Sequence, residues 1–470
     1  MSALETVVRL VQLAAAACFV IGLHLMNSPR TARRGNQVSM GGMAAAVLST
    51  VILIADRGSM TTTGWIVAAA GTAVGGAAGL YAARTVKMTA MPQLVSLFNA
   101  VGGGAAALLA VHELINVIDP DLVGVQTSLT AGLDIVIGGV TFTGSLVAAG
   151  KLQGLVSGAP VVFPGSKVVN ALLALAFLVG VGWIIGDPSS LPALLLTAAA
   201  GLAFGVTMVL PIGGADMPVV ISLLNAFTGT AVAMAGFVLE STVLIIAGAL
   251  VGASGAILTT LMADAMNRSI VSIMVGGFGT GDSAVAVGAG GDASVRAVSA
   301  DDVAIQLAYA GRVVIVPGYG LAAAQAQNEV AELAGILKEH GVDVVYAIHP
   351  VAGRMPGHMN VLLAEANVPY PELKEMDEIN PQFPQIDVAL VVGANDVTNP
   401  AARRPGNPVS GMPILDVDRA RSVVVIKRSM GKGYAGLDND LYSDPRTGMY
   451  FADAKAGLAE ISSAVKSLVG

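Results

Sequence analysis

The sequence predicts a polytopic α-helical membrane bundle of about nine spans, followed by an α/β domain with a doubly wound parallel sheet. Only 12% of the 470 residues are charged, about half the usual share in soluble proteins, and the mean hydropathy is +0.73. Residues 1–264 are a succession of apolar, Gly/Ala-rich runs of membrane-spanning length, which predicts the bundle. Residues 291–470 alternate strand-like and helical patterns, and the Gly-rich residues 265–290 between the two parts are interpreted as a linker.

Nine apolar segments approach the length of about 20 residues that a helix needs to cross a bilayer. They are centred on residues 6–26, 38–55, 64–83, 92–112, 128–149, 167–186, 191–210, 217–237 and 241–262. Basic residues follow the first, third and fifth segments, at Arg30, Arg33, Arg34, Arg84, Lys87, Lys151 and Lys167. The opposite connections carry Asp56 beside Arg57, then Asp119, Asp121, Asp187 and Glu240. The positive-inside rule therefore places the N-terminus outside and the C-terminal domain in the cytoplasm.

Charge and cysteine content argue against several classes of function. The net charge of −7, without a long basic run, argues against nucleic-acid binding. The single cysteine, Cys18, lies in an apolar run and excludes a disulfide framework within the chain. His340, His349 and His358 lack the spacing to cysteine or carboxylate partners that is typical of metal sites, so no metal is expected.

Four polar residues fall in or beside the predicted spans, where each is costly in hydrocarbon. Asn99 lies in the fourth span, Asp134 in the fifth and Asn225 in the eighth, and Asp216 lies at the cytoplasmic start of the eighth. Asn99 and Asn225 are candidates for a water or proton path, and the cost of a carboxylate in hydrocarbon favours a function for Asp134. Interhelical hydrogen bonds would explain the two asparagines equally well, and Asp216 could simply cap a helix N-terminus.

Apolar runs in the α/β domain predict buried parallel strands, separated by helices. The strand candidates are Arg312–Pro317, Val342–Ile348, Val388–Val392 and Val423–Lys427, with two shorter ones around Ile414 and Tyr450. The helical candidates are Ala322–His340 and His358–Asn367. Strand and helix alternation predicts right-handed crossovers in a Rossmann-like sheet.

A glycine-rich turn directly after the first strand candidate predicts dinucleotide binding. Gly318, Tyr319 and Gly320 open a helix, and Ala323 stands where a third glycine is usual. Glycines let the backbone approach a pyrophosphate, and the helix N-terminus offers unpaired N–H groups.

The second strand candidate ends at Ile348-His349-Pro350, without the acidic residue that binds the 2′-hydroxyl of NAD, which favours NADP. Arg354 lies where ordinary Rossmann geometry would use it for a 2′-phosphate, whereas Lys427-Arg428-Ser429 lies at the ligand edge of a later strand. Both could also be solvated surface. The run Gly431–Gly436, with Tyr434 inside it, is interpreted as a mobile lid.

These residues resemble a known family, the proton-translocating nicotinamide nucleotide transhydrogenases. The segments Gly318–Gln327, His349–Tyr370, Gly393–Pro400 and Lys427–Gly436 resemble the family's NADP(H)-binding domain. In the membrane part, the stretches that resemble the family's beta subunit are Met91–Leu97, Gly139–Ser145, Gly213–Leu224 and Ala265–Gly279.

The resemblance implies hydride transfer between NADH, held on a partner, and NADP held here, coupled to proton movement and generating NADPH. The implied partners are alpha subunits that carry an NAD(H)-binding domain and further membrane helices, in a dimeric complex of the bacterial cytoplasmic (inner) membrane. It also implies that NADP lies reversed relative to ordinary Rossmann proteins, which assigns the 2′-phosphate to Lys427, Arg428 and Ser429 and leaves Arg354 for other phosphate contacts.

The resemblance further implies residue roles. Asp396 and Tyr319 would act at the nicotinamide end, with Asp396 also in the coupling machinery. The implied cofactor-binding residues are Gly318, Tyr319, Gly320, Leu321, Ala322, Ala323, His349, Val351, Ala352, Gly353, Arg354, Gly393, Ala394, Asn395, Asp396, Lys427, Arg428, Ser429, Gly433, Tyr434 and Ala435. In the membrane, Asp216 would mark the junction with the nucleotide domain and Asn225 a polar element of the proton path.

One departure and two rival functions stay open from the sequence. Some family members have a histidine where this chain has Asn99, and an asparagine cannot carry a proton. The protonatable group would then lie on a partner, or the path would use water and another residue. The first rival is a channel or secondary transporter gated by a nucleotide-sensing cytoplasmic Rossmann domain, and the second is a structural membrane anchor for a soluble dehydrogenase.

Overall fold

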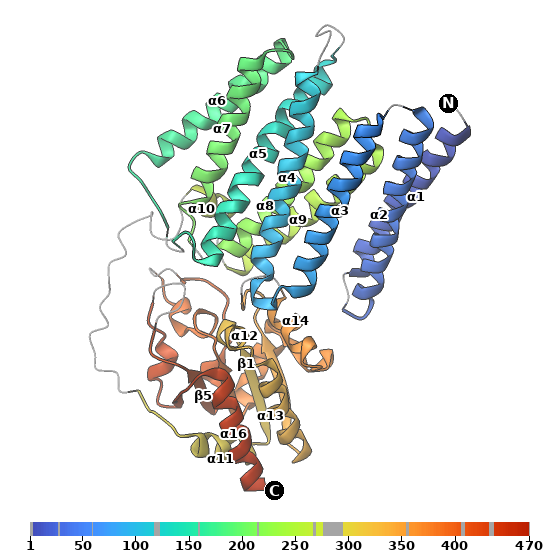
Figure 1. Ribbon diagram of the computed structural model, residues 1–470. Coiled ribbons are helices and arrows are strands. Elements are labelled where there is room, and N and C mark those ends of the chain that lie inside the picture. The colour runs from blue at the N-terminus through green and yellow to red at the C-terminus, as the bar shows by residue number, and fades with distance from the viewer. Residues whose placement is uncertain are drawn as a thin grey trace.

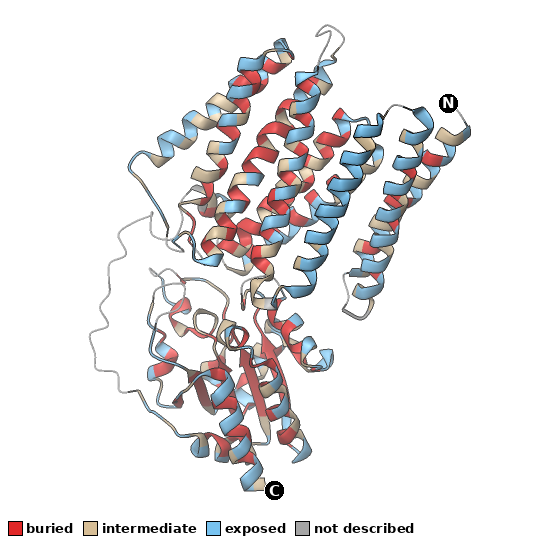
Figure 2. Ribbon diagram, in the orientation of Figure 1, coloured by how far each residue is buried: buried red, intermediate tan, exposed pale blue. Residues whose placement is uncertain are grey.

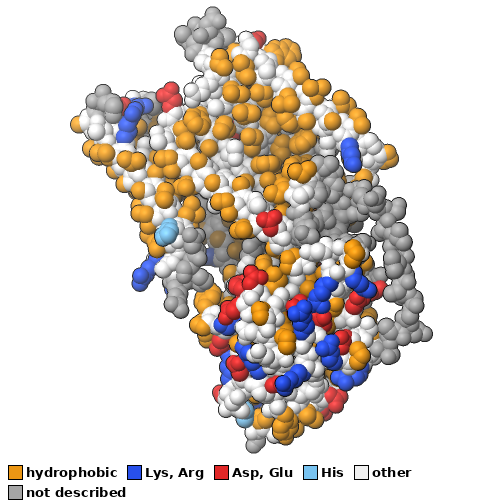
Figure 3. Space-filling model, turned by 180° about the vertical axis from the view of Figure 1, so that it is seen from behind, with side chains coloured by type: hydrophobic (Ala, Val, Ile, Leu, Met, Phe, Trp, Pro, Cys, Tyr) orange, Lys and Arg blue, Asp and Glu red, His pale blue; other side chains and the backbone are white. Residues whose placement is uncertain are grey.

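The computed structural model describes residues 3–26, 29–58, 60–116, 123–157, 160–213, 216–266, 269–275, 295–353, 357–405, 409–431 and 437–469. Within these ranges the chain forms a helical bundle followed by an α/β domain, which lies below one end of the bundle in Figure 1. The bundle surface is mostly hydrophobic, whereas Lys, Arg, Asp and Glu gather on the α/β domain (Figure 3).

Nine helices among the described residues are long and apolar enough to cross a membrane, as the sequence predicts. They are α1 (Ala3–Met26), α2 (Pro29–Arg57), α3 (Thr62–Thr85), α4 (Met91–Ile115), α5 (Val125–Gln153), α6 (Ser166–Gly186), α7 (Leu191–Val209), α8 (Met217–Val238) and α9 (Thr242–Ala265). A short helix, α10 (Ile270–Val275), follows α9 inside the predicted linker, and the 3₁₀ turn η1 (Met88–Ala90) joins α3 to α4.

Small residues let the bundle helices approach closely. A Cβ added to Gly229 of α8 would lie 2.2 Å from the Gly252 nitrogen of α9, and one added to Gly248 would lie 2.4 Å from the Ala233 nitrogen. Thus α8 and α9 pack backbone against backbone, which only glycine permits. The opposite case is α3, which buries no residue within this chain and is exposed along its length in Figure 2.

The α/β domain holds a six-stranded parallel sheet in the order β3-β2-β1-β4-β5-β6. The strands are β1 (Arg312–Pro317), β2 (Asp343–Ile348), β3 (Leu373–Glu375), β4 (Val388–Val392), β5 (Ser422–Lys427) and β6 (Thr447–Phe451). This is the Rossmann order, in which the chain reverses direction across the sheet between β1 and β4. Such a switch point leaves a crevice at the carboxyl ends of the two strands.

Alternating side chains of the strands feed two buried layers. Val313 and Ile315 pack on one face with α11 (Ala300–Ala308), α13 (Gln327–Glu339), α14 (His358–Glu365) and α16 (Ala454–Val469). Val314 and Val316 pack on the other face, which α15 (Met376–Ile379) and 3₁₀ turns cover. The central strands are buried on both faces, which explains why they read as continuous hydrophobic runs.

Three features of the predicted domain are wrong in detail. No strand forms around Ile414, because its carbonyl accepts the Asn380 side chain (2.9 Å) and the Leu415 N–H donates to the Val397 carbonyl (2.9 Å). The helix predicted over Ala322–His340 is two helices, α12 (Tyr319–Ala324) and α13, because Gln325 adopts a left-handed conformation (φ 53°) between them. Finally, the helices α11 and α16 and the three-residue edge strand β3 were not predicted.

The missed helix α11 has a recognisable start. Ser299 Oγ accepts the Asp302 N–H (3.2 Å), and the Asp302 carboxylate accepts the Ser299 N–H (3.0 Å). This reciprocal pair is a capping box, which a Ser-x-x-Asp sequence can signal in advance.

The carboxyl edge of the sheet lies toward the bundle. Helix α12 follows the carboxyl end of β1, contacts η1, and lies at the side of the domain nearest the bundle (Figure 1). Ligand contacts at this edge are therefore adjacent to the cytoplasmic connections that the charge pattern predicts.

Candidate functional site

The loops after β1 and β4 cross at the switch point with their backbones in contact. The Gly318 N–H donates to the Val392 carbonyl and the Gly320 N–H to the Gly393 carbonyl, both at 2.9 Å. A Cβ on Gly318 would lie 2.3 Å from Ala394 Cα, and one on Gly393, whose φ is +68°, would lie 2.4 Å from Gly320 Cα. The glycines of the fingerprint are thus required by the fold itself, because two loops pass where only hydrogen atoms fit.

A cavity of about 310 Å³ opens beside this crossing, and we call it the site cavity. Its lining residues come from α12, the loop after β4, the end of β5 with the residues after it, and the junction between β6 and α16: Gly320, Ala323, Ala324, Gly393, Ala394, Asn395, Ile426, Lys427, Arg428, Ser429, Gly431, Ala452, Asp453 and Ala454. Segments more than 100 residues apart in the chain therefore build one concave surface of the size that small ligands occupy. Six of these residues were not among the predicted site residues: Ala324, Ile426, Gly431, Ala452, Asp453 and Ala454.

Lys427 supplies positive charge to the site cavity at the carboxyl end of β5. Its ammonium donates to the Gly431 carbonyl and lies 4.6 Å from the centre of the Tyr442 ring. Burial lowers the pKa of Lys427, while the nearby carboxylates of Asp396 and Asp438 act in the opposite direction. Together with Arg428 and Ser429 it forms a donor set suited to a phosphate dianion.

An amide network fixes the loop after β4. Asn439 Nδ2 donates to the carbonyl (3.0 Å) and to the side-chain oxygen (3.2 Å) of Asn395, and Asn399 Nδ2 donates to the Asp438 carbonyl (3.1 Å). The loop that carries Asp396 is thereby tied to Asp438 and Asn439. Asn399 and Asn439 are buried. They were not predicted as site residues, because single asparagines beside glycine-rich loops give little signal in a sequence.

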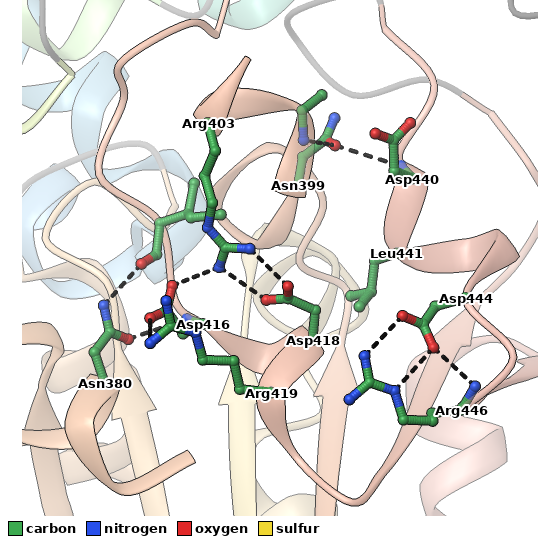
Figure 4. A network of polar contacts seen from close by, with 12 residues as sticks. Asn380, Asn399, Arg403, Asp416, Asp418, Arg419, Asp440, Leu441, Asp444 and Arg446 are labelled. Carbon is green, nitrogen blue, oxygen red and sulfur yellow. Dashed lines mark hydrogen bonds and ion pairs between the residues drawn. The ribbon is translucent and has the colours of Figure 1, made fainter. Parts of the chain in front are cut away.

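Ion pairs behind this loop hold its continuation in place (Figure 4). The Arg403 guanidinium donates to Asp416 (2.5 Å) and to Asp418 (2.6 and 2.9 Å), and Figure 4 shows it directed at both carboxylates. The bond with Asp418 raises the pKa of Arg403 most; burial opposes it, and the bond with Asp416 adds to the rise. Asn399 Oδ1 also accepts the Asp440 N–H (3.4 Å), which joins the loop after β4 to the 3₁₀ turn at Asp440–Ser443.

At the end of β2, the buried His349 uses both of its ring nitrogens in hydrogen bonds. His349 is 1% exposed, its Nε2 bonds the Pro413 carbonyl (2.8 Å), and its Nδ1 accepts the Val351 N–H (3.2 Å). Burial lowers the pKa of His349 to about 4, and the bond to Pro413 offsets this only in part. The ring is therefore neutral at physiological pH and ties the β2 loop to the segment before β5.

The remaining predicted site residues lie around α12, after β2, or outside the described residues. Gly353 has φ +106°, and a Cβ there would lie 2.4 Å from His358 Nδ1, so both the backbone conformation and the close contact require glycine. The Tyr319 ring lies 6.5 Å from the His358 ring and does not line the site cavity. Leu321, Ala322 and Ala352 are buried in the core beneath the loops. Arg354, Gly433, Tyr434 and Ala435 lie outside the described residues.

In the bundle, the structure brings Asn99 beside the helix that carries Asn225. Asn99 Nδ2 donates to the Ile221 carbonyl (3.2 Å), and Thr228 Oγ1 donates to the Asn99 carbonyl (3.3 Å). Asn225 is half-buried on α8 between these two contacts. Asp216 is fully buried at the N-cap position of α8 but makes no side-chain capping bond, about 14 Å along the helix from Asn225.

Asp134 lies apart from this group. It is fully buried, and neither carboxylate oxygen has a hydrogen-bond partner among the described residues. Ser96 of α4 donates to the Ser145 carbonyl of α5, and Gly103 of α4 lies against Gly138, so the two helices run antiparallel. Asn99 is therefore level with about residue 142 of α5, roughly 12 Å along the bundle from Asp134. Two separate polar levels therefore exist within the bundle.

One further buried charge lies at the end of α5. Lys151 is 5% exposed and donates to the carbonyls of Leu210 (2.6 Å) and Ile212 (2.8 Å), just beyond α7. From the sequence Lys151 is predicted only in a charged connection, because no local pattern shows that its ammonium reaches the carbonyls after α7. Within the described ranges, no group of His, Cys, Asp and Glu side chains could hold a metal ion.

Comparison with known proteins places this architecture. A family model described as "NAD(P) transhydrogenase beta subunit" matches residues 8–464. Two curated relatives from Rhodospirillum rubrum, one of them from strain ATCC 11170, are named "NAD(P) transhydrogenase subunit beta". Each is 49% identical over 461 residues, which cover 96% of this chain and 97% of the relative.

Proposed function

The chain belongs to the family of NAD(P) transhydrogenase beta subunits, and from this premise we propose that NADP(H) binds in the site cavity of its α/β domain. The chain is the membrane subunit of a proton-translocating transhydrogenase, an enzyme that uses nicotinamide nucleotides. The finer assignment concerns which nucleotide binds here, which residues hold it, and which partner holds the other. The gated-transporter alternative is not favoured, because the match runs through both halves of the chain.

The observation that carries the NADP(H) proposal is the position of the basic cluster. Lys427, Arg428 and Ser429 line the site cavity at the end of β5, on the far side of the switch point from β2. The β2 end, where an ordinary Rossmann protein binds the adenosine ribose, offers the neutral and fully engaged His349 instead. The 2′-phosphate end of NADP then lies at β5, which is the reversed orientation that the resemblance implies.

The residues present fit such a cofactor in charge and shape. Two cations and a hydroxyl offer several donors to a phosphate dianion, and the crossing of the β1 and β4 loops presents backbone rather than side chains to the cofactor. When bound, the nicotinamide ring supplies the hydride chemistry, so the protein needs no nucleophile of its own. Asp396 and Tyr319 are proposed to act at the nicotinamide end by orienting it and by limiting its access to water.

The partner is an alpha subunit, and we propose that it holds NAD(H) and further membrane helices in a dimeric complex. Helix α3 supports the second part, because a span that buries no residue in its own chain leaves its glycine-rich faces open for helices of a partner. Hydride transfer requires the two nicotinamides to meet, so the site cavity must open toward the partner's domain.

Coupling of hydride transfer to proton movement would act through the contact between the carboxyl edge of the sheet and the bundle, where α12 meets η1. We propose residues 1–264 as the proton-translocating domain, 265–290 as the linker and 291–470 as the NADP(H) domain, with Tyr434 in a lid over the cofactor. Asn99, Asp134, Asp216 and Asn225 are the proposed proton-path or coupling groups, and each nucleotide state would favour one arrangement of them.

The chain is a multi-pass membrane protein by the length and composition of its helices. We propose the bacterial cytoplasmic membrane, with the N-terminus outside and the α/β domain inside. Protease added to inside-out vesicles should then digest the α/β domain, whereas protease added to right-side-out vesicles should leave it intact. The reverse pattern would overturn the orientation.

Nucleotide binding to the full-length chain in detergent tests the cofactor assignment. Calorimetry should show NADP⁺ binding that is about a hundredfold tighter than NAD⁺ binding, because charge-assisted bonds to the 2′-phosphate are strong. The double substitution Lys427→Ala and Arg428→Ala should abolish this preference and leave NAD⁺ affinity within about threefold. Lys466→Ala is the matched control, since Lys466 pairs with Glu332 on the surface at the other end of α16. Equal affinities in the wild type, or a preference that survives the double substitution, would contradict the proposal.

A further inference from the structure

Tyr442 lies beneath the site cavity without lining it. It belongs to the 3₁₀ turn η8 (Asp440–Ser443) and is 3% exposed. Its ring lies under the Lys427 ammonium, and its hydroxyl donates to Asn395 Oδ1 at 2.9 Å. We propose that Tyr442 is a positioning residue for recognition of the 2′-phosphate, because it holds both Lys427 and Asn395 in place. The proposal rests on the proposed function, in which Lys427 binds that phosphate.

The contact with Lys427 restricts a side chain that is otherwise long and mobile. Lysine has a flexible four-carbon stem, so an unrestrained ammonium loses much conformational freedom when it binds a phosphate. Here the Nζ atom lies 4.6 Å from the ring centre, within the range in which the negative face of an aromatic ring attracts a cation. The Gly431 carbonyl accepts from the same ammonium. The two contacts hold Lys427 at the cavity wall before any ligand arrives.

The hydroxyl acts on the other wall of the site cavity. Asn395 Oδ1 accepts from both Tyr442 (2.9 Å) and Asn439 Nδ2 (3.2 Å), so its carboxamide is held from the oxygen side. The amide nitrogen, which is the donor of that side chain, is thereby turned to the opposite side. Burial raises the pKa of Tyr442, so its hydroxyl stays protonated and remains a donor. One side chain therefore links the end of β5 to the loop after β4.

A purely structural role of Tyr442 would give a different pattern of nucleotide binding. Tyr442 also packs in the buried layer with Leu441, Leu415 and Val417, so its loss could loosen the domain without any specific effect on the phosphate. Such loosening would weaken NADP⁺ and NAD⁺ binding alike. A positioning role through Lys427 predicts a loss confined to the nucleotide that carries the 2′-phosphate.

The test measures NADP⁺ and NAD⁺ binding to full-length variants by calorimetry. Tyr442→Leu should weaken NADP⁺ binding roughly fivefold to thirtyfold and change NAD⁺ binding by less than about twofold, since a buried cation–π contact is lost. Tyr442→Phe keeps the ring and should stay within about threefold of the wild type for both nucleotides. Tyr442→Met, an unbranched and flexible apolar side chain without a ring, carries the same expectation as Tyr442→Leu if the leucine variant does not fold.

A double-mutant cycle with Lys427→Ala separates the inference from the proposed function. In the Lys427→Ala background, Tyr442→Leu should change NADP⁺ and NAD⁺ binding equally, by less than about twofold, because the cation that the ring positions is gone and only the bond to Asn395 is lost. Additive losses, equal losses for both nucleotides, or an unchanged NADP⁺ affinity in the leucine or methionine variant would each overturn the role of Tyr442 while leaving the cofactor assignment intact. If Lys427→Ala alone leaves NADP⁺ affinity unchanged, the 2′-phosphate assignment is wrong and the inference falls with it.

Discussion

The bundle and the α/β domain satisfy their polar side chains in different ways. In the bundle, Ser96, Asn99 and Ser222 each donate to a backbone carbonyl on a neighbouring helix, and Lys151 donates to two carbonyls just beyond α7. In the α/β domain, side chains also bond backbone carbonyls, as Asn399 does with Asp438, but many pair with oppositely charged side chains, as Arg403 does with Asp416 and Asp418. The bundle therefore uses donors almost alone, whereas the domain uses donors and acids together.

The solvent explains this difference. A helix carbonyl has a second lone pair that can accept a bond without any cost to the helix, so Ser, Thr, Asn and Lys are tolerated in hydrocarbon. A carboxylate has no such partner, because helix N–H groups beyond the first turn are already used. Asp134 is the exception to this pattern, which is the physical reason to suspect a function for it.

The first prediction concerns the crossing of the β1 and β4 loops, where we expect the largest effect on stability. Gly393→Ala should destabilise the α/β domain by about 3 kcal/mol or more, since the new Cβ would overlap the Gly320 backbone at a positive φ. Hydrogen exchange of β1 and β4 amides in the full-length chain measures the loss.

Gly335 of α13 is the matched control for that substitution. A Cβ there meets nothing within 4 Å, so Gly335→Ala should slightly stabilise the domain, by about 0.5–1 kcal/mol. A loss of stability at Gly335 equal to that at Gly393 would mean that the crossing of the loops is not what requires glycine.

The second prediction concerns His349, which the domain keeps neutral. Its folded pKa is about 4 and lies below the ordinary value of 6.5, so its contribution is complete above pH 6.5 and is lost as pH falls toward 4. The domain should lose roughly 2 kcal/mol between pH 7 and pH 5 from this group. Hydrogen exchange or thermal unfolding at several pH values measures the slope.

His349→Gln should flatten that slope, because glutamine does not titrate. His340→Gln is the matched control, since His340 is exposed at the end of α13 and its replacement should leave the slope unchanged. A slope that persists in His349→Gln would assign the acid sensitivity to other groups.

The third prediction sharpens the exception in the bundle. Asp134→Asn should reduce proton translocation about tenfold in the reconstituted complex, if the carboxylate takes part in the path, and should leave thermal stability unchanged or raised. A pH-sensitive dye in proteoliposomes measures translocation. Asp187→Asn, in an exposed loop, is the control and should have no effect. Normal translocation together with lower stability would show that Asp134 is structural.

The fourth prediction is the smallest, and it tests the use of carbonyls as partners. Ser222→Ala removes a donor to the Gly255 carbonyl (3.2 Å) and should cost only about 0.6 kcal/mol. Thermal unfolding in micelles should shift by roughly 1–2 °C. A shift several times larger would mean that Ser222 holds α8 and α9 together, rather than the glycines between them.

The elements that the sequence predicts well are those with strong local patterns. All nine spans are confirmed, because about 20 apolar residues in succession have few other interpretations. The four long strand runs match β1, β2, β4 and β5, since strands buried on both faces read as continuous Val and Ile. The edge strand β3 has only Leu373 as an apolar residue, and its pairing with β2 is a tertiary fact.

The site was predictable where a local motif carries it. The glycines after β1 and the basic cluster after β5 are visible in the sequence, and the structure brings Gly320, Gly393, Lys427, Arg428 and Ser429 to one cavity. Asn439, Tyr442 and Asp453 are single polar or aromatic residues without a pattern, so only their positions in the fold show that they support or line the site.

The sequence by itself determined the division into a membrane part and a nucleotide part, because hydropathy and strand–helix alternation are local properties of the chain. Only the tertiary structure decided what the polar residues do. It showed that Lys151 reaches two carbonyls just beyond α7, that Asp134 has no donor among the described residues, and that Tyr442 links Lys427 to Asn395. The reason is physical: a charge or an amide acquires its role from the partners around it, and those partners come from distant parts of the chain.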